Sequence, residues 1–135
     1  MKALVMKEVG KLVLEDRPIP QVKEPDDILL KIKAIGICGS DVKIVEGKHH
    51  FKPDTILGHE FCSVVVEVSS HVHHLKIGDS VSVDNNIRCC FCDFCRMGLT
   101  SHCVDIKTSA LGVMRDRGTQ NTVLFPKNNV TWFRT

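Results

Sequence analysis

The stretch CCFCDFCRMGLTSHC, residues 89–103, has the spacing of a metal-binding segment. Four of its cysteines are separated by three, three and eight positions: Cys89, Cys92, Cys95 and Cys103. Two-residue gaps let consecutive sulfurs fold onto one ion at about 2.3 Å, and Gly98 supplies a bend before the fourth ligand. Because four thiolates close the coordination shell of zinc, the spacing predicts a structural zinc lobe rather than a catalytic site.

Two other interpretations of these cysteines are weaker. Disulfides require an oxidising compartment and usually an even cysteine count, whereas this chain has seven cysteines and no leader sequence. Cys90 could replace Cys89 as a ligand, but only one residue would then precede Cys92, which is too short for the usual loop. We therefore expect Cys90 to be the spare thiol.

Length and composition indicate an ordinary globular domain. The 135 residues suffice for one domain with a core, and 43% are hydrophobic and 25% charged. The apolar runs are too short to cross a bilayer, and the start, MKALVMKE, lacks the apolar stretch of a secretory signal. The formal net charge is +2 and the cations are scattered. We expect a cytoplasmic protein with neither a membrane nor a nucleic acid as partner.

Short strand-like runs dominate the rest of the chain. Two runs rich in Val and Leu flank Val9-Gly10 and predict a β-hairpin, after which Pro18, Pro20 and Pro25 mark a linker. Alternating or β-branched runs predict further strands at 27–38, 61–68, 80–84, 110–114 and 121–126. Many short strands with few helices predict an all-β, barrel-like domain.

One short helix is predicted after the strand at 27–38. Ser40 or Asp41 is placed to cap it, and Gly47 is placed to end it, which gives a helix over 41–47. Cys38 then lies at a strand-to-helix turn.

Cys38 and His59 suggest a second metal site. One thiolate and one imidazole on loops, with ligand positions left unfilled, are what a catalytic zinc requires. In the alternative interpretation Cys38 is a buried small hydrophobe and His59 a hydrogen-bonded loop histidine. Spacing alone leaves both interpretations open. For the cluster of His71, His73 and His74 we expect solvated loop residues, because apolar residues interleave with them before a tight turn at 76–79.

Four motifs in one order carry a family resemblance. They are GICGSD at 36–41, LGHEF at 57–61, KIGDSV at 76–81 and the cysteine stretch at 89–103. Over residues 1–130 the chain resembles the N-terminal, chaperonin-10-like catalytic domain of the zinc-dependent medium-chain alcohol dehydrogenases, and most closely the sorbitol and threonine dehydrogenase branch. The resemblance implies a mainly β, partly open barrel with short helices and a zinc-binding cysteine lobe.

The resemblance also implies roles for individual residues. Cys38 and His59 match protein ligands of the catalytic zinc, and Glu60 matches a carboxylate in its first or second shell. Ser40 matches the hydroxyl that takes the substrate proton, and Asp41 would orient His59. The four spaced cysteines match the structural zinc ligands. The implied substrate is a small alcohol or polyol, and the implied full-length enzyme is a homo-oligomer.

The chain departs from the family pattern at several positions. Lys43 replaces a relay histidine, and a cation that stays protonated near neutrality is a poorer proton acceptor. The family pattern has glycine at four further positions, and a glycine with positive φ would cost about 1 kcal/mol or more to replace. Those positions are Ser63, Ser69, Cys90 and Arg117, and the last begins the altered segment RGTQNT.

No GxGxxG motif occurs in the sequence, so we expect residues 1–135 to form the catalytic domain without a dinucleotide-binding domain. NAD or NADP would then bind only with a second domain, and this chain alone is predicted to be inactive. The alternatives are a truncated, catalytically silent zinc-binding or oligomerisation module and, less favoured, a zinc-knuckle nucleic-acid binder.

Overall fold

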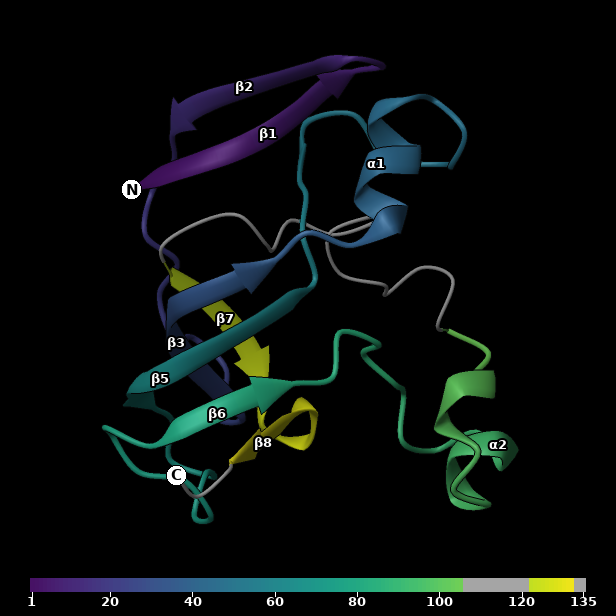
Figure 1. Ribbon diagram of the computed structural model, residues 1–135. Helices are drawn as coiled ribbons and strands as arrows, with labels where there is room; N and C mark the ends of the chain where they lie inside the picture. Colours follow the sequence, from purple (N-terminus) through teal and green to yellow (C-terminus); the bar gives the residue numbers. More distant parts are fainter. Residues whose placement is uncertain (106–121, 133–135) are drawn as a thin grey trace.

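Two antiparallel sheets frame the computed structural model, which describes residues 1–105 and 122–132 (Figure 1). One sheet has the strand order β2-β1-β4 and the other the order β7-β3-β5-β6-β8. The strands are β1 (Lys2–Glu8), β2 (Lys11–Asp16), β3 (Asp27–Gly36), β4 (Thr55–Ile56), β5 (Glu60–Val68), β6 (Ser80–Val83), β7 (Thr122–Pro126) and β8 (Val130–Trp132). The helices are α1 (Gly39–Val45) and α2 (Asp93–Arg96), with 3-10 turns η1 (Thr100–His102) and η2 (Lys127–Asn129). This architecture confirms the predicted fold class.

Most of the predicted strands in the described part of the chain are confirmed. The hairpin turns at Gly10, whose φ is 76°, and the strand predicted at 27–38 ends two residues early, at Gly36. The strand predicted at 110–114 and the loop at 115–118 lie outside the described residues. Strands β4 and β8 and helix α2 were not expected, because each is too short to carry a periodic pattern.

The main core lies against the five-stranded sheet. Alternate residues of β5 are buried, among them Phe61 and Val65, and the Phe61 ring meets Phe125 edge to face with centroids 5.8 Å apart. Burial of each large apolar side chain stabilises the fold by about 1.5–3 kcal/mol. The cluster comprises Ile28, Leu30, Phe61, Val65, Val72, Leu75, Val81, Val123, Phe125 and Val130.

The tip of the first hairpin seats helix α1. The Gly10 amide donates a hydrogen bond to the Val45 carbonyl at 2.8 Å. Gly47 ends the helix with φ of 74°, and a Cβ there would lie 2.9 Å from Val9 Cγ1, so glycine is required on both counts. The prediction that Gly47 terminates this helix is confirmed.

The predicted cap of α1 is wrong, because the helix begins two residues earlier than expected. Its N-cap is Cys38 rather than Ser40 or Asp41. Asp41 is the third helical residue, and its Oδ2 accepts the Cys38 amide proton at 2.9 Å, as the distal acid of a capping box does.

The family pattern has glycine at four positions where this chain has another residue. Of the three that are described, Cys90 has a positive φ, of 67°, and Ser63 and Ser69 do not. The prediction of left-handed strain is therefore wrong for Ser63, which lies within β5, and for Ser69, whose hydroxyl donates to the Glu24 carbonyl at 2.7 Å. Arg117 lies outside the described residues.

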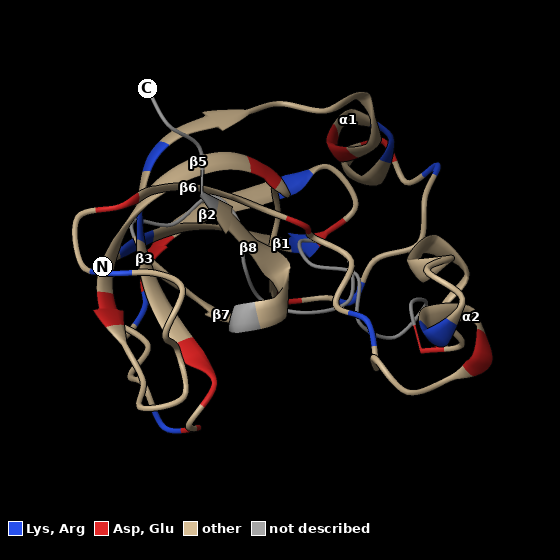
Figure 2. Ribbon diagram, turned by 90° about the horizontal axis from the view of Figure 1, so that it is seen from below, with Lys and Arg blue, Asp and Glu red and all other residues tan. Residues whose placement is uncertain are grey.

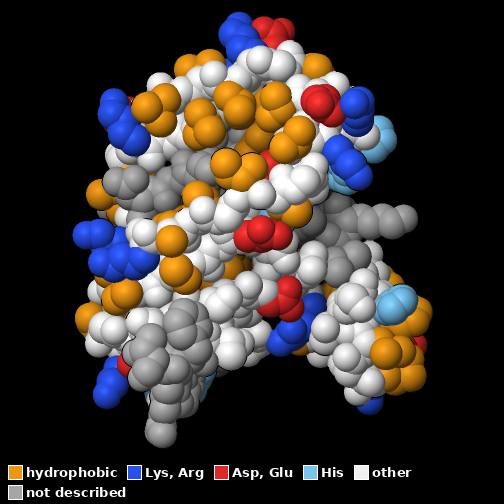
Figure 3. All heavy atoms as spheres, viewed as in Figure 1, with side chains coloured by type: hydrophobic (Ala, Val, Ile, Leu, Met, Phe, Trp, Pro, Cys, Tyr) orange, Lys and Arg blue, Asp and Glu red, His pale blue; other side chains and the backbone are white. Residues whose placement is uncertain are grey.

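The described surface is mixed in charge and exposes apolar side chains. In Figure 2 acidic and basic residues are interspersed around the described chain, as the scattered cations of the sequence predict. Figure 3 shows exposed apolar side chains over the first hairpin and on the cysteine lobe, which stands to one side of the sheets in Figure 1. On the lobe these are Phe91, Phe94, Met97, Leu99 and Val104. No helix in the described ranges is long and apolar enough to span a membrane.

Candidate metal centres

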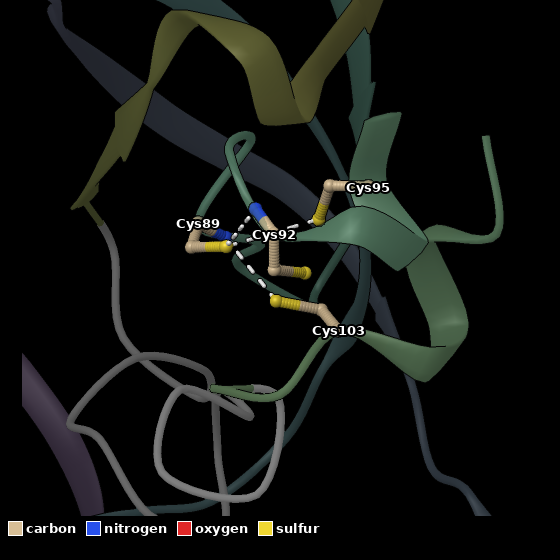
Figure 4. Close-up of side chains that lie close together, drawn as sticks. All are labelled: Cys89, Cys92, Cys95 and Cys103. Atoms are coloured by element: carbon tan, nitrogen blue, oxygen red, sulfur yellow. Dashed lines mark hydrogen bonds between the residues drawn. The ribbon is translucent and has the colours of Figure 1, made fainter. Parts of the chain in front are cut away.

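The four spaced cysteines converge on one point. Their sulfurs lie within 4.8 Å of one another, and Figure 4 shows the side chains turned inward from the loop before α2, from α2 itself and from the end of η1. Gly98 makes the bend between the third and fourth cysteine with φ of 80°. Cys103 is the most buried of the four, with a relative exposure of 2%.

Backbone amides of the lobe point at the sulfurs. The Cys89 amide donates to Cys103 Sγ at 3.3 Å, and the Cys92 amide donates to Cys89 Sγ at 3.4 Å (Figure 4). Cys89 Sγ and Cys95 Sγ are 3.9 Å apart. Such N–H donors stabilise negative charge on sulfur, so the loop is built for thiolates.

The acidity of the thiols reflects this arrangement. Backbone hydrogen bonds from Cys95 and Val104 lower the pKa of the Cys92 thiol to about 6, and one from Cys89 lowers the pKa of Cys103. Desolvation raises the pKa of the Cys95 thiol to about 12. Several adjacent thiolates repel one another unless a cation lies between them. The four convergent thiols, two of them with lowered pKa values, therefore fit a divalent, thiophilic metal such as zinc.

Cys90 does not join the cluster. Its side chain is exposed, and its Sγ lies 3.8 Å from both the Arg88 carbonyl oxygen and Asn128 Nδ2. This placement agrees with the prediction that Cys90 is the spare thiol.

A second convergence joins the end of β3 to the start of β5. One ligand atom each from Cys38, His59 and Glu60 lies within 4.8 Å of the others. Cys38 caps α1, and Gly58, with φ of 92°, makes the turn that brings His59 to the same place. These residues bring together one thiol, one imidazole and one carboxylate, which are all zinc-ligand types, and only three in number, which leaves a position for another ligand.

Two residues of α1 contact His59 from opposite sides. Ser40 Oγ lies 3.3 Å from Nε2, and Asp41 Oδ1 lies 3.4 Å from Nδ1. Asp41 is 9% exposed, and its other oxygen accepts the Cys38 amide proton, which fixes the carboxylate, whereas Asp41 Oδ1 and His59 Nδ1 are buried and make no hydrogen bond among the described residues. All five residues predicted for this centre therefore lie together.

The histidines at 71, 73 and 74 belong to neither centre. His71, His73 and His74 are exposed, as predicted for loop residues, and His71 Nδ1 lies 3.5 Å from Asp26 Oδ1. Lys43 is also exposed, one turn beyond Ser40 on α1.

One residue that matters for the lobe was missed by the sequence analysis. The Asn129 side chain is buried, and its Nδ2 donates to the carbonyls of Asp84 at 3.1 Å and Asn86 at 2.9 Å. Arg88 adds a bond from Nη2 to the Asn128 carbonyl at 2.8 Å. These bonds hold the segment that leads into the lobe, but in the sequence KNN is only a polar run.

Comparison with known proteins decides the family. The family profile described as "Alcohol dehydrogenase GroES-like domain" matches residues 24–134. The chain belongs to this family. This match to the GroES-like domain of the zinc-dependent medium-chain dehydrogenases confirms the resemblance carried by the four motifs.

Similar proteins lie in the polyol branch and beyond it. D-xylulose reductase A of Aspergillus niger is 38% identical over 112 residues, which cover 80% of this chain and 31% of that protein. Galactitol-1-phosphate dehydrogenase of Escherichia coli superposes with a TM-score of 0.91 at 30% identity, over 100% of this chain and 38% of the other. A protein of Sinorhizobium meliloti 1021, solved with NADP, gives 0.88 at 35% identity, over 98% and 38%. The chain thus spans about a third of the length of its curated relatives.

Proposed function

We propose that this chain is the metal- and substrate-binding part of an NAD(P)-dependent dehydrogenase that oxidises a secondary hydroxyl of a polyol or similar small alcohol. The observation that carries the proposal is the convergence of Cys38, His59 and Glu60 within 4.8 Å, with the Ser40 hydroxyl 3.3 Å from His59. The polyol class is supported by the similarity to D-xylulose reductase A.

Cys38 and His59 would hold a zinc ion, and Glu60 would lie in or next to its ligand shell. When bound, the metal would supply Lewis acidity, which lowers the pKa of a coordinated alcohol. Ser40 Oγ would accept the released proton, a role supported by its position beside His59 and by its being only half-buried. Asp41 would keep the His59 ring oriented through Nδ1.

Because position 43 is Lys43 and not the histidine of relatives, the proton would leave Ser40 by a different route. A lysine side chain offers hydrogen-bond donors and no acceptor. The Ser40 proton would therefore pass to solvent rather than to a side chain one turn further along α1.

The nicotinamide would come from another part of the protein. Residues 1–135 contain no GxGxxG motif, and hydride transfer needs a cofactor held against the substrate carbon. We propose that residues 1–135 form the catalytic domain, with the structural zinc lobe at 89–103, and contain no dinucleotide-binding domain.

The test is to follow the second metal and its ligands. The lobe is filled with zinc, Co²⁺ is titrated into the remaining centre, and its visible spectrum is recorded before and after addition of sorbitol. We expect one Co²⁺ per chain, a spectrum that shifts with sorbitol, and loss of this Co²⁺ in Cys38→Ser and His59→Ala. His73→Ala, a change of an exposed loop histidine, is the matched control and should bind normally. A bound Co²⁺ whose spectrum does not change on addition of sorbitol or other polyols would favour the interpretation that the chain is a catalytically silent module.

Activity provides the complementary test. The zinc-loaded chain is mixed with NAD or NADP and a panel of polyols, threonine and simple alcohols, and nicotinamide absorbance is followed. We expect no turnover, because no dinucleotide site is proposed within 1–135. Turnover that disappears in Cys38→Ser would show that a cofactor site exists in this chain.

A further inference from the structure

We propose that Gly36 is a positioning residue of the second metal centre: its missing side chain leaves the space in which the Glu60 carboxylate lies beside Cys38 and His59. This inference rests on the proposed function, because it assumes that the centre binds metal. It concerns the glycine at the end of β3, which contacts neither Cys38 nor His59 through a side chain of its own.

The sheet register places Gly36 directly opposite Glu60. The two are partners in the antiparallel ladder between β3 and β5. Side chains of opposite residues project from the same face with Cβ atoms about 4.5–5.5 Å apart. Where one partner is glycine, the other side chain can fold across the bare backbone.

The Glu60 side chain uses this space. A Cβ built on Gly36 would lie 3.0 Å from Glu60 Oε2 and 3.4 Å from Glu60 Cβ. Such a contact is tighter than side chains normally make, so any residue larger than glycine requires the end of the flexible Glu60 side chain to shift by a few tenths of an ångström or more. The carboxylate that must move is the one whose oxygen lies within 4.8 Å of the Cys38 and His59 ligand atoms.

Backbone conformation does not explain the glycine. The φ of Gly36 lies outside the left-handed region, so alanine would fit the backbone without strain. The same is true of Gly39, three residues along, but a Cβ there would meet nothing within 4 Å. The two glycines lie on either side of Cys38. The difference that matters is that only a Cβ at Gly36 would meet the Glu60 carboxylate.

Substitution at Gly36 should therefore weaken the second metal and leave the fold intact. The Glu60 side chain is exposed, so the displaced carboxylate can turn into solvent. Mutation of residues that position metal ligands typically lowers metal affinity by 10- to 100-fold. We therefore expect Gly36→Ala to lower the metal affinity of the second centre by roughly tenfold. Gly36→Val, with two more methyl groups at the same point, should weaken it at least as much.

The experiment measures Co²⁺ affinity of the second centre in the full chain, with zinc already in the lobe. The variants are Gly36→Ala, Gly39→Ala as matched control, Glu60→Ala, and the double variant Gly36→Ala with Glu60→Ala. We expect Gly36→Ala to lose affinity and to change the Co²⁺ spectrum, and Gly39→Ala to do neither. In the Glu60→Ala background the Gly36→Ala change should have no further effect, because the group it displaces is gone.

Far-UV circular dichroism and the metal content of the lobe serve as measures of folding, and both should match the unmodified chain. Equal Co²⁺ affinities for Gly36→Ala and Gly39→Ala, or a Gly36→Ala loss that persists without Glu60, would overturn the inference while the proposed function stands. An unmodified chain that takes up no second metal would overturn both.

Discussion

Replacing Cys90 by glycine should stabilise the metal lobe. Cys90 has φ of 67°, a conformation that strains a residue with a side chain by about 1–2 kcal/mol. Among the described residues its exposed thiol makes two polar contacts, both of 3.8 Å, which contribute little. Glycine also lowers the free energy of unfolding by about 0.4–1 kcal/mol, because it makes the unfolded chain more flexible. The net gain should be about 0.5–1 kcal/mol.

Two variants isolate the cause. Cys90→Ala removes the thiol and keeps the strain, so it should stay within about 0.5 kcal/mol of the unmodified chain. Gly98→Ala introduces the same strain at φ of 80°, where a Cβ would meet nothing within 4 Å, and should cost about 0.5–1 kcal/mol.

The assay is zinc affinity of the lobe, measured by competition with a chromophoric chelator. Metal binding and folding are coupled in such small lobes, so local stability appears as affinity. A gain of 0.5–1 kcal/mol corresponds to about two- to fivefold tighter binding. The reasoning would be refuted if Cys90→Gly bound zinc no more tightly than Cys90→Ala, or if Gly98→Ala had no effect.

Three further outcomes are expected. Cys95→Ser should release the lobe metal, whose binding contributes about 10–16 kcal/mol in comparable peptides, and elemental analysis with limited proteolysis would detect the loss. Ser63→Ala should raise the urea midpoint by the equivalent of about 1–3 kcal/mol, because the Ser63 hydroxyl is buried with no partner among the described residues. Hydrogen bonds from Lys7 and Arg17 lower the pKa of Asp54 from its ordinary 3.8, so its contribution to stability is present above that value and lost as the pH falls through the lowered one. Asp54→Asn should therefore make the thermal midpoint less sensitive to acid, as calorimetry at several pH values would show.

The parts of the fold that the sequence predicts are those with a local pattern. Period-two or β-branched runs mark β1, β3 and β5, and these strands pair as long ladders. Strand β4 has only two residues and exists because Val5 and Met6 pair with it, and β8 has three residues that pair with β6. Such short strands form because neighbouring strands pair with them, so their own sequence does not predict them.

The two candidate centres differ in the same way. The lobe cysteines lie within 15 positions at separations of three, three and eight, and that spacing predicts the geometry they adopt. Cys38 and His59 are 21 positions apart, and their own spacing left a structural alternative open. The cap of α1 was misplaced for a related reason. Propensity favours Ser40 or Asp41 as cap, but both lie inside the helix, where their side chains contact His59 and Asp41 also accepts the Cys38 amide proton as the distal acid of the capping box.

Sheet register is what makes the second centre possible. Between Ile32 and Ala34, strand β3 advances by two residues while β5 advances by one, which is a β-bulge. Gly36 consequently stands opposite Glu60. Without the extra residue Ile35 would stand there, and a branched side chain would fill the space in which the carboxylate lies. The lobe ligands all lie within one short segment, whereas the second centre depends on a bulge and a bare backbone in a strand that contributes no ligand from within its own span.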